Sequence, residues 1–126
     1  MTDNRRAGKI LVVDDDPNLT RSVTFILQKE GYLVDTATNG EEAMEKIRNL
    51  KPRLIYLDVM MPKKNGYEVC QEIKTDINLN DVYVIMLTAK GQERDREKGM
   101  DMGADEFITK PFSPKFIVER TKAILG

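Results

Sequence analysis

Three apolar runs, widely separated along the chain, each lead into polar residues that can carry chemistry. The first, residues 10–13, is followed by three aspartates, the second, 54–57, leads into Asp58, and the third, 82–87, leads into Thr88. Continuous apolar runs of this length are typical of strands buried on both faces of a parallel sheet. Because parallel strands end at one common edge, where α/β proteins bind ligands, we expect these polar residues to gather there.

The alternation of strand and helix patterns predicts an α/β fold. Strands are expected at 10–13, 32–36, 54–57, 82–87 and 105–109, and helices at 17–30, 41–50, 67–73, 91–102 and 114–125. Short connections between them favour a five-stranded parallel sheet with helices on both faces and right-handed crossovers. Neither an internal repeat nor a Pro/Ser-rich linker interrupts the pattern. We therefore expect one domain over 9–126, preceded by a flexible N-terminal arm, 1–8.

The composition excludes several classes of function. The chain has 126 residues with 20 Lys plus Arg, 21 Asp plus Glu, one Cys and no His. Without histidine, Ser-His-Asp and Cys-His catalysis, histidine metal sites and a histidine phosphocarrier are excluded. The balanced charge argues against direct nucleic-acid binding by this domain. One cysteine cannot form an internal disulfide, and the sequence contains neither a membrane-spanning stretch nor a secretion signal, so we expect a cytoplasmic location without membrane association.

The aspartates at the predicted sheet edge form a candidate cation site. Asp16 precedes Pro17 and is expected to cap the following helix, which leaves Asp14 and Asp15 beside Asp58. Carboxylates this close repel one another unless a cation neutralises them. Mg²⁺ suits such a site because it prefers oxygen ligands and keeps waters that phosphate oxygens can replace. A solvated cap or turn is the alternative interpretation of the three consecutive aspartates.

The remaining polar residues at this edge suit phosphoryl transfer. Asp58 could act as a carboxylate nucleophile and form an acyl phosphate, with the backbone carbonyl of Met60 as a further metal ligand. Lys110 precedes Pro111, which favours an extended backbone there, and its ammonium could stabilise a phosphoryl group. Thr88 would complete the site, although a threonine at a strand end is commonplace.

Taken together, these fragments resemble the receiver domain of two-component response regulators, over nearly the whole chain after its first eight residues. The motifs that carry the resemblance are VVDDDP, LDVMMPKKNG, LTAKG and GADEFITKPFSP. It implies a flavodoxin-like sheet with strand order 2-1-3-4-5, Mg²⁺ as the required ion, and a sensor histidine kinase or phosphotransfer protein as phosphodonor. It assigns the acidic pair to Asp14 and Asp15, the phospho-acceptor to Asp58, the metal-binding carbonyl to Met60, the lysine to Lys110, and the switch residues to Thr88 and Phe107.

The resemblance also implies how such a domain signals. After phosphorylation of Asp58, Thr88 moves to hydrogen-bond the phosphoryl group and Phe107 turns inward. This changes the surface made by the fourth helix, fifth strand and last helix, which controls an output domain or partner. The domain is then a switch that catalyses its own phosphotransfer and slow dephosphorylation, and not an enzyme. A core phenylalanine that never moves is the alternative interpretation of Phe107.

The segments 91–107 and KPFSPK resemble receivers of winged-helix transcription factors, which dimerise through this same surface. Five charged residues match positions of that dimer surface, namely Arg96, Asp105, Glu106, Arg120 and Lys122. Phe116 departs from the pattern, because that subfamily usually has there an acidic residue that pairs with the equivalent of Arg96. A homodimer on phosphorylation is therefore less strongly expected. The chain is compatible with a stand-alone receiver or with the first domain of a longer regulator, whose DNA-binding output would lie outside it.

Two further interpretations compete with the receiver. A phosphohydrolase of the haloacid dehalogenase type would use Asp14 and Asp16 as a D-x-D pair, but it would leave Asp58 unexplained. A receiver-like binding module that is never phosphorylated would not need Asp58 or Lys110. Within the receiver interpretation, the side chains of Met60 and Lys90 flank the path of the hydrolytic water. Neither gives obvious help to water, so we expect a slowly hydrolysed acyl phosphate.

Overall fold

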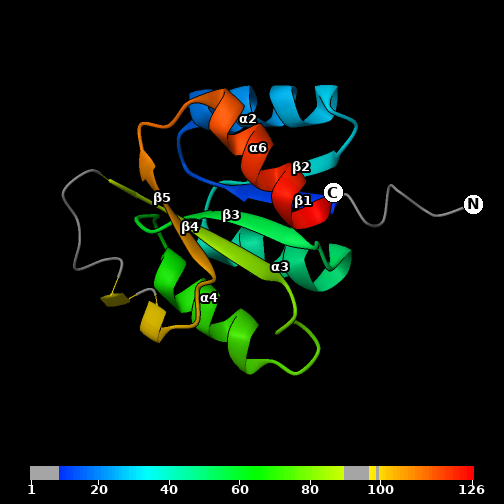
Figure 1. The fold of residues 1–126 in the computed structure, drawn as a ribbon. Helices are drawn as coiled ribbons and strands as arrows, with labels where there is room; N and C mark the ends of the chain where they lie inside the picture. The colour runs from blue at the N-terminus through cyan, green and yellow to red at the C-terminus, as the bar shows by residue number, and fades with distance from the viewer. Residues whose placement is uncertain (1–8, 90–96, 99) are drawn as a thin grey trace, which may run out of the picture.

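The computed structural model describes residues 9–89, 97–98 and 100–126, which form a parallel sheet between two helical layers (Figure 1). The strands are β1 (Lys9–Val13), β2 (Leu33–Ala37), β3 (Leu54–Asp58), β4 (Tyr83–Ala89) and β5 (Glu106–Lys110). The helices that lie wholly within the described residues are α2 (Pro17–Lys29), α3 (Gly40–Leu50), α4 (Gly66–Thr75) and α6 (Pro114–Leu125). The strand order is β2-β1-β3-β4-β5, and every neighbouring pair is parallel. The predicted α/β class and the strand order implied by the resemblance are confirmed.

Two predicted segments fall wholly or largely outside the described residues. The expected N-terminal arm, 1–8, is one of them. The other is most of the predicted helix 91–102, although residues 97–98 and 100–101 are helical. In the part of the chain that is described, no helix combines the length and apolar character needed to cross a bilayer.

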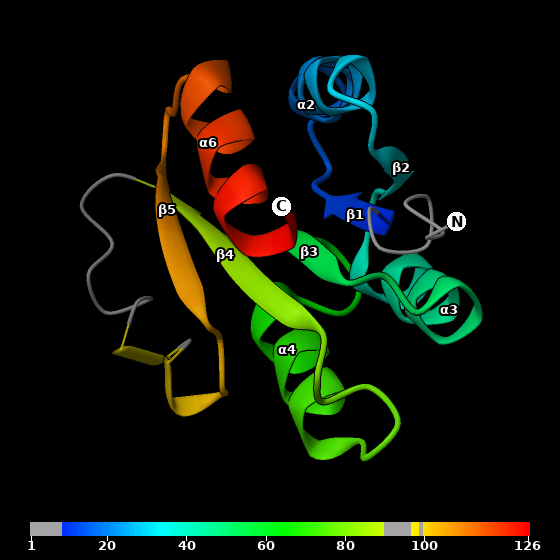
Figure 2. The ribbon, with the colours of Figure 1, turned by 45° about the vertical axis from the view of Figure 1, so that its right-hand side comes forward.

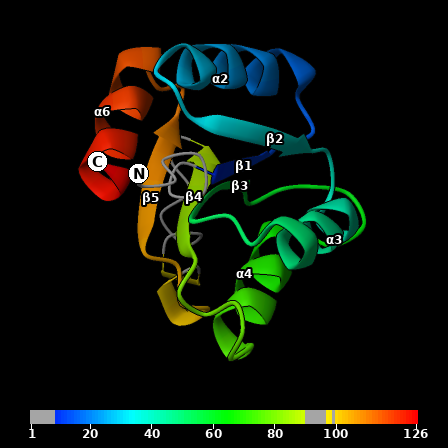
Figure 3. The same ribbon diagram turned by 90° about the vertical axis from the view of Figure 1, so that its right-hand side faces the viewer.

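The two faces of the sheet bury separate apolar clusters. Helices α2 and α6 cover one face, and α3 and α4 cover the other (Figures 2 and 3). The central strand β3 is buried throughout, and its first four side chains alternate between the clusters, with Leu54 and Tyr56 toward α2 and α6 and Ile55 and Leu57 toward α3 and α4. A strand covered on both faces needs a continuous apolar run, which explains why its sequence pattern was recognisable.

One polar side chain and one glycine set the two ends of α2. The side chain of Asp16 caps α2, as predicted, by accepting a hydrogen bond from the backbone N–H of Asn18 at 2.9 Å. Gly31, just after α2, has a φ of +98°, and its N–H donates to the carbonyl of Gln28 at 3.0 Å. A left-handed residue in this place is the usual way to satisfy the last carbonyls of a helix, and glycine adopts it without steric cost.

The last two strands differ from the predicted bounds. β4 continues through Thr88 to its end at Ala89 because Thr88 pairs with Thr109 of β5. β5 begins one residue later than predicted, at Glu106, and Asp105 just before it contacts β4 by accepting the N–H of Val84 with its carboxylate at 2.8 Å. The other described strands and helices agree with the predicted bounds within two residues.

Candidate functional site

Lys110, the last residue of β5, lies between two buried carboxylates at the carboxyl edge of the sheet. Its Nζ is 2.7 Å from Oδ2 of Asp14, which follows β1, and 3.3 Å from Oδ1 of Asp58, which ends β3. Asp14 is 1% exposed and Asp58 is 7% exposed. Buried charges are tolerated only when they are paired and hydrogen-bonded. The lysine therefore supplies one positive charge to two carboxylates, which compensates them only in part.

A third carboxylate completes an acidic group at the mouth of the site. Asp14, Asp15 and Asp58 each offer one carboxylate oxygen, and these oxygens lie within 4.8 Å of one another. Asp15 is exposed, whereas Asp14 is fixed in orientation by accepting the N–H of Asp16 at 2.9 Å. Oxygen ligands from carboxylates, with open positions for water, are the donor set that Mg²⁺ prefers. The residues present therefore fit the predicted ion.

The electrostatics of the site set the protonation states of Asp58 and Lys110. Burial and, to a lesser extent, the negative charge of Asp14 raise the pKa of Asp58 to about 6, against the opposing effect of Lys110. Burial lowers the pKa of Lys110, but its contacts with Asp14 and Asp58 outweigh burial and raise the pKa overall. At neutral pH Asp58 is therefore mostly ionised and Lys110 charged, the states that a carboxylate nucleophile and its electrostatic partner require.

The loop after β3 begins with a contact to the same carboxylate. The N–H of Met60 donates to Oδ1 of Asp58 at 3.4 Å, and the Met60 side chain is 66% exposed. The loop thus starts at the acidic group and turns its methionine side chain toward solvent. The metal-binding role of the Met60 carbonyl stays a prediction.

The two predicted switch residues lie on neighbouring strands. Thr88, near the end of β4, is 5% exposed, and Phe107 of β5 is half-buried against the cluster under α3 and α4. Side chains alternate along a strand, and Val84 and Met86 belong to that same cluster. Thr88 therefore projects from the same face of the sheet as Phe107. Lys90, predicted to flank the path of the hydrolytic water, lies outside the described residues.

Four of the charged residues predicted for a dimer surface form ion pairs within the chain. Arg120 of α6 donates through Nε to Oε1 of Glu106 at 2.9 Å, and the hydroxyl of Tyr83 donates to Oε2 of the same carboxylate at 2.5 Å. Two further ion pairs, each 2.8 Å long, are Lys122 with Glu30 and Asp105 with Lys74. The sequence pattern identified these residues as charged surface positions but did not reveal their partners. Arg96, also predicted for that surface, is outside the described residues.

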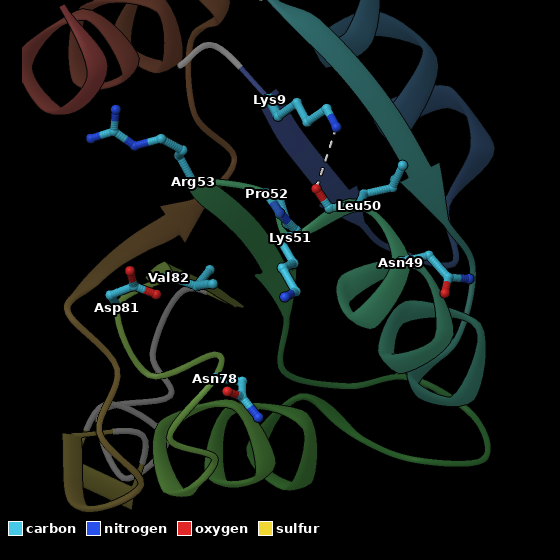
Figure 4. A pocket seen from close by; sticks show the side chains of 9 residues that line it. All are labelled: Lys9, Asn49, Leu50, Lys51, Pro52, Arg53, Asn78, Asp81 and Val82. Atoms are coloured by element: carbon cyan, nitrogen blue, oxygen red, sulfur yellow. Dashed lines mark hydrogen bonds between the residues drawn. The ribbon is translucent and has the colours of Figure 1, made fainter. Parts of the chain in front are cut away.

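A separate cavity of about 480 Å³ lies at the opposite edge of the sheet, where the strands begin. Its charged residues are Lys9, Lys51, Arg53 and Asp81. Figure 4 shows the three cationic side chains pointing in different directions, with Lys9 turned toward the carbonyl of Leu50. Charges that diverge cannot bind one anion together. The acidic group at the carboxyl edge is therefore the stronger candidate site.

Comparison with known proteins identifies the family of this chain. A family model described as the response regulator receiver domain matches residues 10–122. The chain belongs to the response regulator receiver family. This match spans most of the domain predicted at 9–126, and it confirms the resemblance stated from the motifs.

Relatives of this receiver include transcriptional regulators. The alkaline phosphatase synthesis transcriptional regulatory protein PhoP of Bacillus subtilis is 46% identical over 117 residues, 93% of this chain and 48% of that protein. A transcriptional regulatory protein CpxR homolog of Haemophilus influenzae is 46% identical over 118 residues, 94% of this chain and 50% of that protein. The receiver spans about half the length of these relatives.

Solved structures resemble the receiver over nearly its whole length. A putative response regulator from Chloroflexus aurantiacus superposes with a TM-score of 0.88 at 33% identity, covering 94% of this chain and 97% of that one. The BeF3-activated DrrB receiver domain gives a TM-score of 0.83 at 38% identity, covering 93% and 96%. These similarities confirm the flavodoxin-like receiver fold.

Proposed function

We propose that this receiver is a phosphorylation-activated switch that accepts a phosphoryl group on Asp58 in the presence of Mg²⁺. The observation that carries the proposal is the position of Lys110 between Asp14 and Asp58, three residues that follow or end different strands. An ammonium in this place can pair with phosphoryl oxygens once Asp58 carries the group. Membership of the receiver family supports the same function.

The proposed transfer is a displacement at phosphorus. A carboxylate oxygen of Asp58 forms a bond to phosphorus while the bond from phosphorus to the donor breaks, and the bonding electron pair leaves with the donor. A sensor histidine kinase or phosphotransfer protein supplies the donor nitrogen. Mg²⁺, held by Asp14, Asp15, Asp58 and the carbonyl of Met60, supplies positive charge to the phosphoryl oxygens when bound. Lys110 supplies the second positive charge.

The proposed output is a population shift between two states of the same fold. Thr88 moves to hydrogen-bond the phosphoryl group, and Phe107 turns into the space that becomes available. Both residues project from the face that α3 and α4 cover. The change reaches the surface around β5 and α6, together with the predicted helix 91–102, and controls an output domain or partner in the cytoplasm. A DNA-binding output of the kind found in transcriptional regulators would lie outside this chain.

The competing phosphohydrolase has less support. It would need Asp14 and Asp16 as its working pair, yet the side chain of Asp16 caps α2 and Asp14 is paired with Lys110. A module that is never phosphorylated would not explain why Asp58 is buried. Burial and the neighbouring Asp14 raise its pKa to about 6, so its charged form is unfavourable there. Keeping an ionisable group in such a place costs stability, which a functional role explains.

Intact-mass spectrometry after incubation with acetyl phosphate and Mg²⁺ tests the proposal. We expect one added phosphoryl group in the wild-type chain, and none with Asp58→Asn or with EDTA. Addition that survives Asp58→Asn would favour the phosphohydrolase, and release of phosphate with turnover would do the same. No addition under any condition would favour the module that is never phosphorylated.

The acyl phosphate is expected to hydrolyse slowly. The side chain of Met60, two residues after Asp58, is exposed and carries no charged group, hydroxyl or amide that could orient a water molecule. Decay of the phosphorylated mass after removal of acetyl phosphate measures the lifetime. A lifetime of only seconds would contradict this expectation.

A further inference from the structure

Gly40, the first residue of α3, lies directly against the loop that follows β3. A methyl group at this position would place its carbon 1.9 Å from the carbonyl oxygen of Lys64 and 2.5 Å from the Cβ of Lys64. Cβ atoms essentially never come closer than 3.0 Å to heavy atoms of residues beyond their chain neighbours. Figure 3 shows the loop between β3 and α4 running past the start of α3. Position 40 therefore admits no side chain while the loop keeps this path.

Local requirements of the helix do not explain the glycine. Alanine is more favourable than glycine in helices, by roughly 1 kcal/mol at interior positions. The capping role belongs to Asn39, whose side chain accepts the N–H of Glu42 at 2.9 Å. Gly40 is also not among the described residues with a positive φ. The close approach of Lys64 is therefore the physical reason for glycine here.

The loop that Gly40 contacts is the one that carries Met60. Its far end is fixed at Gly66, whose N–H donates to the carbonyl of Val59 at 3.0 Å. A methyl group at Gly66 would lie 2.3 Å from the carbonyl oxygen of Asp58, so this end is also in close backbone contact. The loop thus leaves β3 after Asp58 and ends at Gly66, which contacts the backbone of Asp58 and Val59. Gly40 of α3 contacts the loop at Lys64.

We propose that Gly40 is a positioning residue for the cation site: by bringing α3 against Lys64, it holds the loop where the carbonyl of Met60 can bind Mg²⁺. This inference rests on the proposed function. Mg²⁺ demands near-octahedral ligands at about 2.0–2.1 Å. The substitution Gly40→Ala would require the oxygen of Lys64 to move about 1.5 Å to reach the ordinary contact distance of 3.4 Å. A shift of that size transmitted along the loop is enough to displace one ligand.

Direct measurement of Mg²⁺ affinity, by following amide signals in NMR titrations, tests the proposal without phosphorylation. We expect Gly40→Ala to weaken Mg²⁺ binding by at least about tenfold, the loss typical when a group that orients a metal ligand is altered. Gly31→Ala is the matched control. Gly31 has nothing within 4 Å of the added methyl and a φ of +98°, so this variant loses stability without contacting the loop. Its Mg²⁺ affinity should equal that of the wild type.

A second pair of variants tests the proposal even if Gly40→Ala does not fold. Lys64→Ala keeps the Cβ that packs on Gly40, whereas Lys64→Gly removes it, and both lose the ion pair with Glu72. We expect weaker Mg²⁺ binding only with Lys64→Gly. Equal affinities for these two variants would overturn the proposal. Affinity of Gly40→Ala within about twofold of wild type, or an equal loss with Gly31→Ala, would also overturn it. If the wild type itself bound no Mg²⁺, the proposed function would be at fault instead.

Discussion

The phenolic oxygen of Tyr56 lies 2.6 Å from the hydroxyl oxygen of Thr121, and both residues are completely buried. Tyr56 stands on β3, two residues before Asp58, and Thr121 is on α6. Burial raises the pKa of Tyr56 to about 12, so its hydroxyl stays protonated at physiological pH. This hydrogen bond therefore joins the strand of the proposed phospho-acceptor to the last helix of the domain.

Removing either hydroxyl should destabilise the domain. We expect Tyr56→Phe and Thr121→Val each to lower the free energy of unfolding by about 1 kcal/mol, the usual net value of a buried hydrogen bond. The double variant should lose less than the two single losses combined, because the partners share one interaction. Urea unfolding of the four proteins measures the coupling. Tyr32→Phe is the control, since the hydrogen bond of 3.2 Å from the Tyr32 hydroxyl to the carbonyl of Gly126 is exposed. Fully additive losses would contradict the coupling.

The contact of Glu106 with α6 should make stability depend on pH. Burial raises the pKa of Glu106, but hydrogen bonds from Arg120 and Tyr83 outweigh it, so the pKa falls below its ordinary value of 4.5. The folded chain thus binds this proton less tightly than the unfolded chain. The stabilisation is present above the unfolded pKa and is lost as pH falls through the folded pKa.

The variant Glu106→Gln isolates that contribution. We expect its deficit in unfolding free energy, relative to wild type, to be largest near neutral pH and to shrink below about pH 4. Urea unfolding at several pH values measures it. A deficit that stays constant down to about pH 3 would mean that the carboxylate charge contributes nothing.

The strands and the carboxyl-edge site could be predicted because both depend on short-range patterns. A continuous apolar run such as that of β3 identifies a strand buried on both faces, and the residue that follows it must emerge at the sheet edge. This reasoning brings Asp14 and Asp58 to one place without knowledge of side-chain packing. Lys110 was also expected at this edge, but its contacts with both carboxylates depend on side-chain packing, which the pattern does not determine.

Contacts between distant segments could not be predicted, because hydrophobic periodicity does not identify which residues meet across the core. Periodicity gives the face on which Tyr56 or Thr121 lies but not the partner that it meets across the core. The approach of Gly40 to Lys64 depends on the path of a loop, and its only signal in the sequence is a glycine just after the helix-capping Asn39. The intramolecular pairing of Glu106 was missed because a charged residue on an edge strand also fits a dimer surface.

Replacing Asp58 should stabilise the chain in the absence of metal. Burial and the neighbouring Asp14 make the ionised form of Asp58 unfavourable in the folded state and raise its pKa to about 6. We therefore expect Asp58→Asn to raise the midpoint of thermal unfolding at about pH 8 in EDTA, since functional sites commonly cost stability. Added Mg²⁺ should narrow the difference, because it stabilises only the chain that binds it. A lower midpoint for Asp58→Asn in EDTA would contradict this view of the site.

Placing an acidic residue at position 116 should affect both the stability of α6 and the dimerisation of the chain. Phe116 is 42% exposed in the first turn of α6, where its N–H donates to the side chain of Ser113. The variant Phe116→Glu would complete a capping box with Ser113, the N-cap, and add the acid that this helix lacks in its first turn. It would also supply the acidic group expected opposite Arg96 in a dimer.

A matched variant separates these two effects. Phe116→Gln can form the same capping box but carries no charge. We expect both variants to match or exceed the wild type in unfolding free energy, and only Phe116→Glu to strengthen dimerisation of the phosphorylated chain. Sedimentation velocity with and without acetyl phosphate measures the association. If phosphorylated Phe116→Glu sediments as the wild type does, this surface does not form the expected dimer. The internal pairing of Glu106 with Arg120 would then be its stable arrangement.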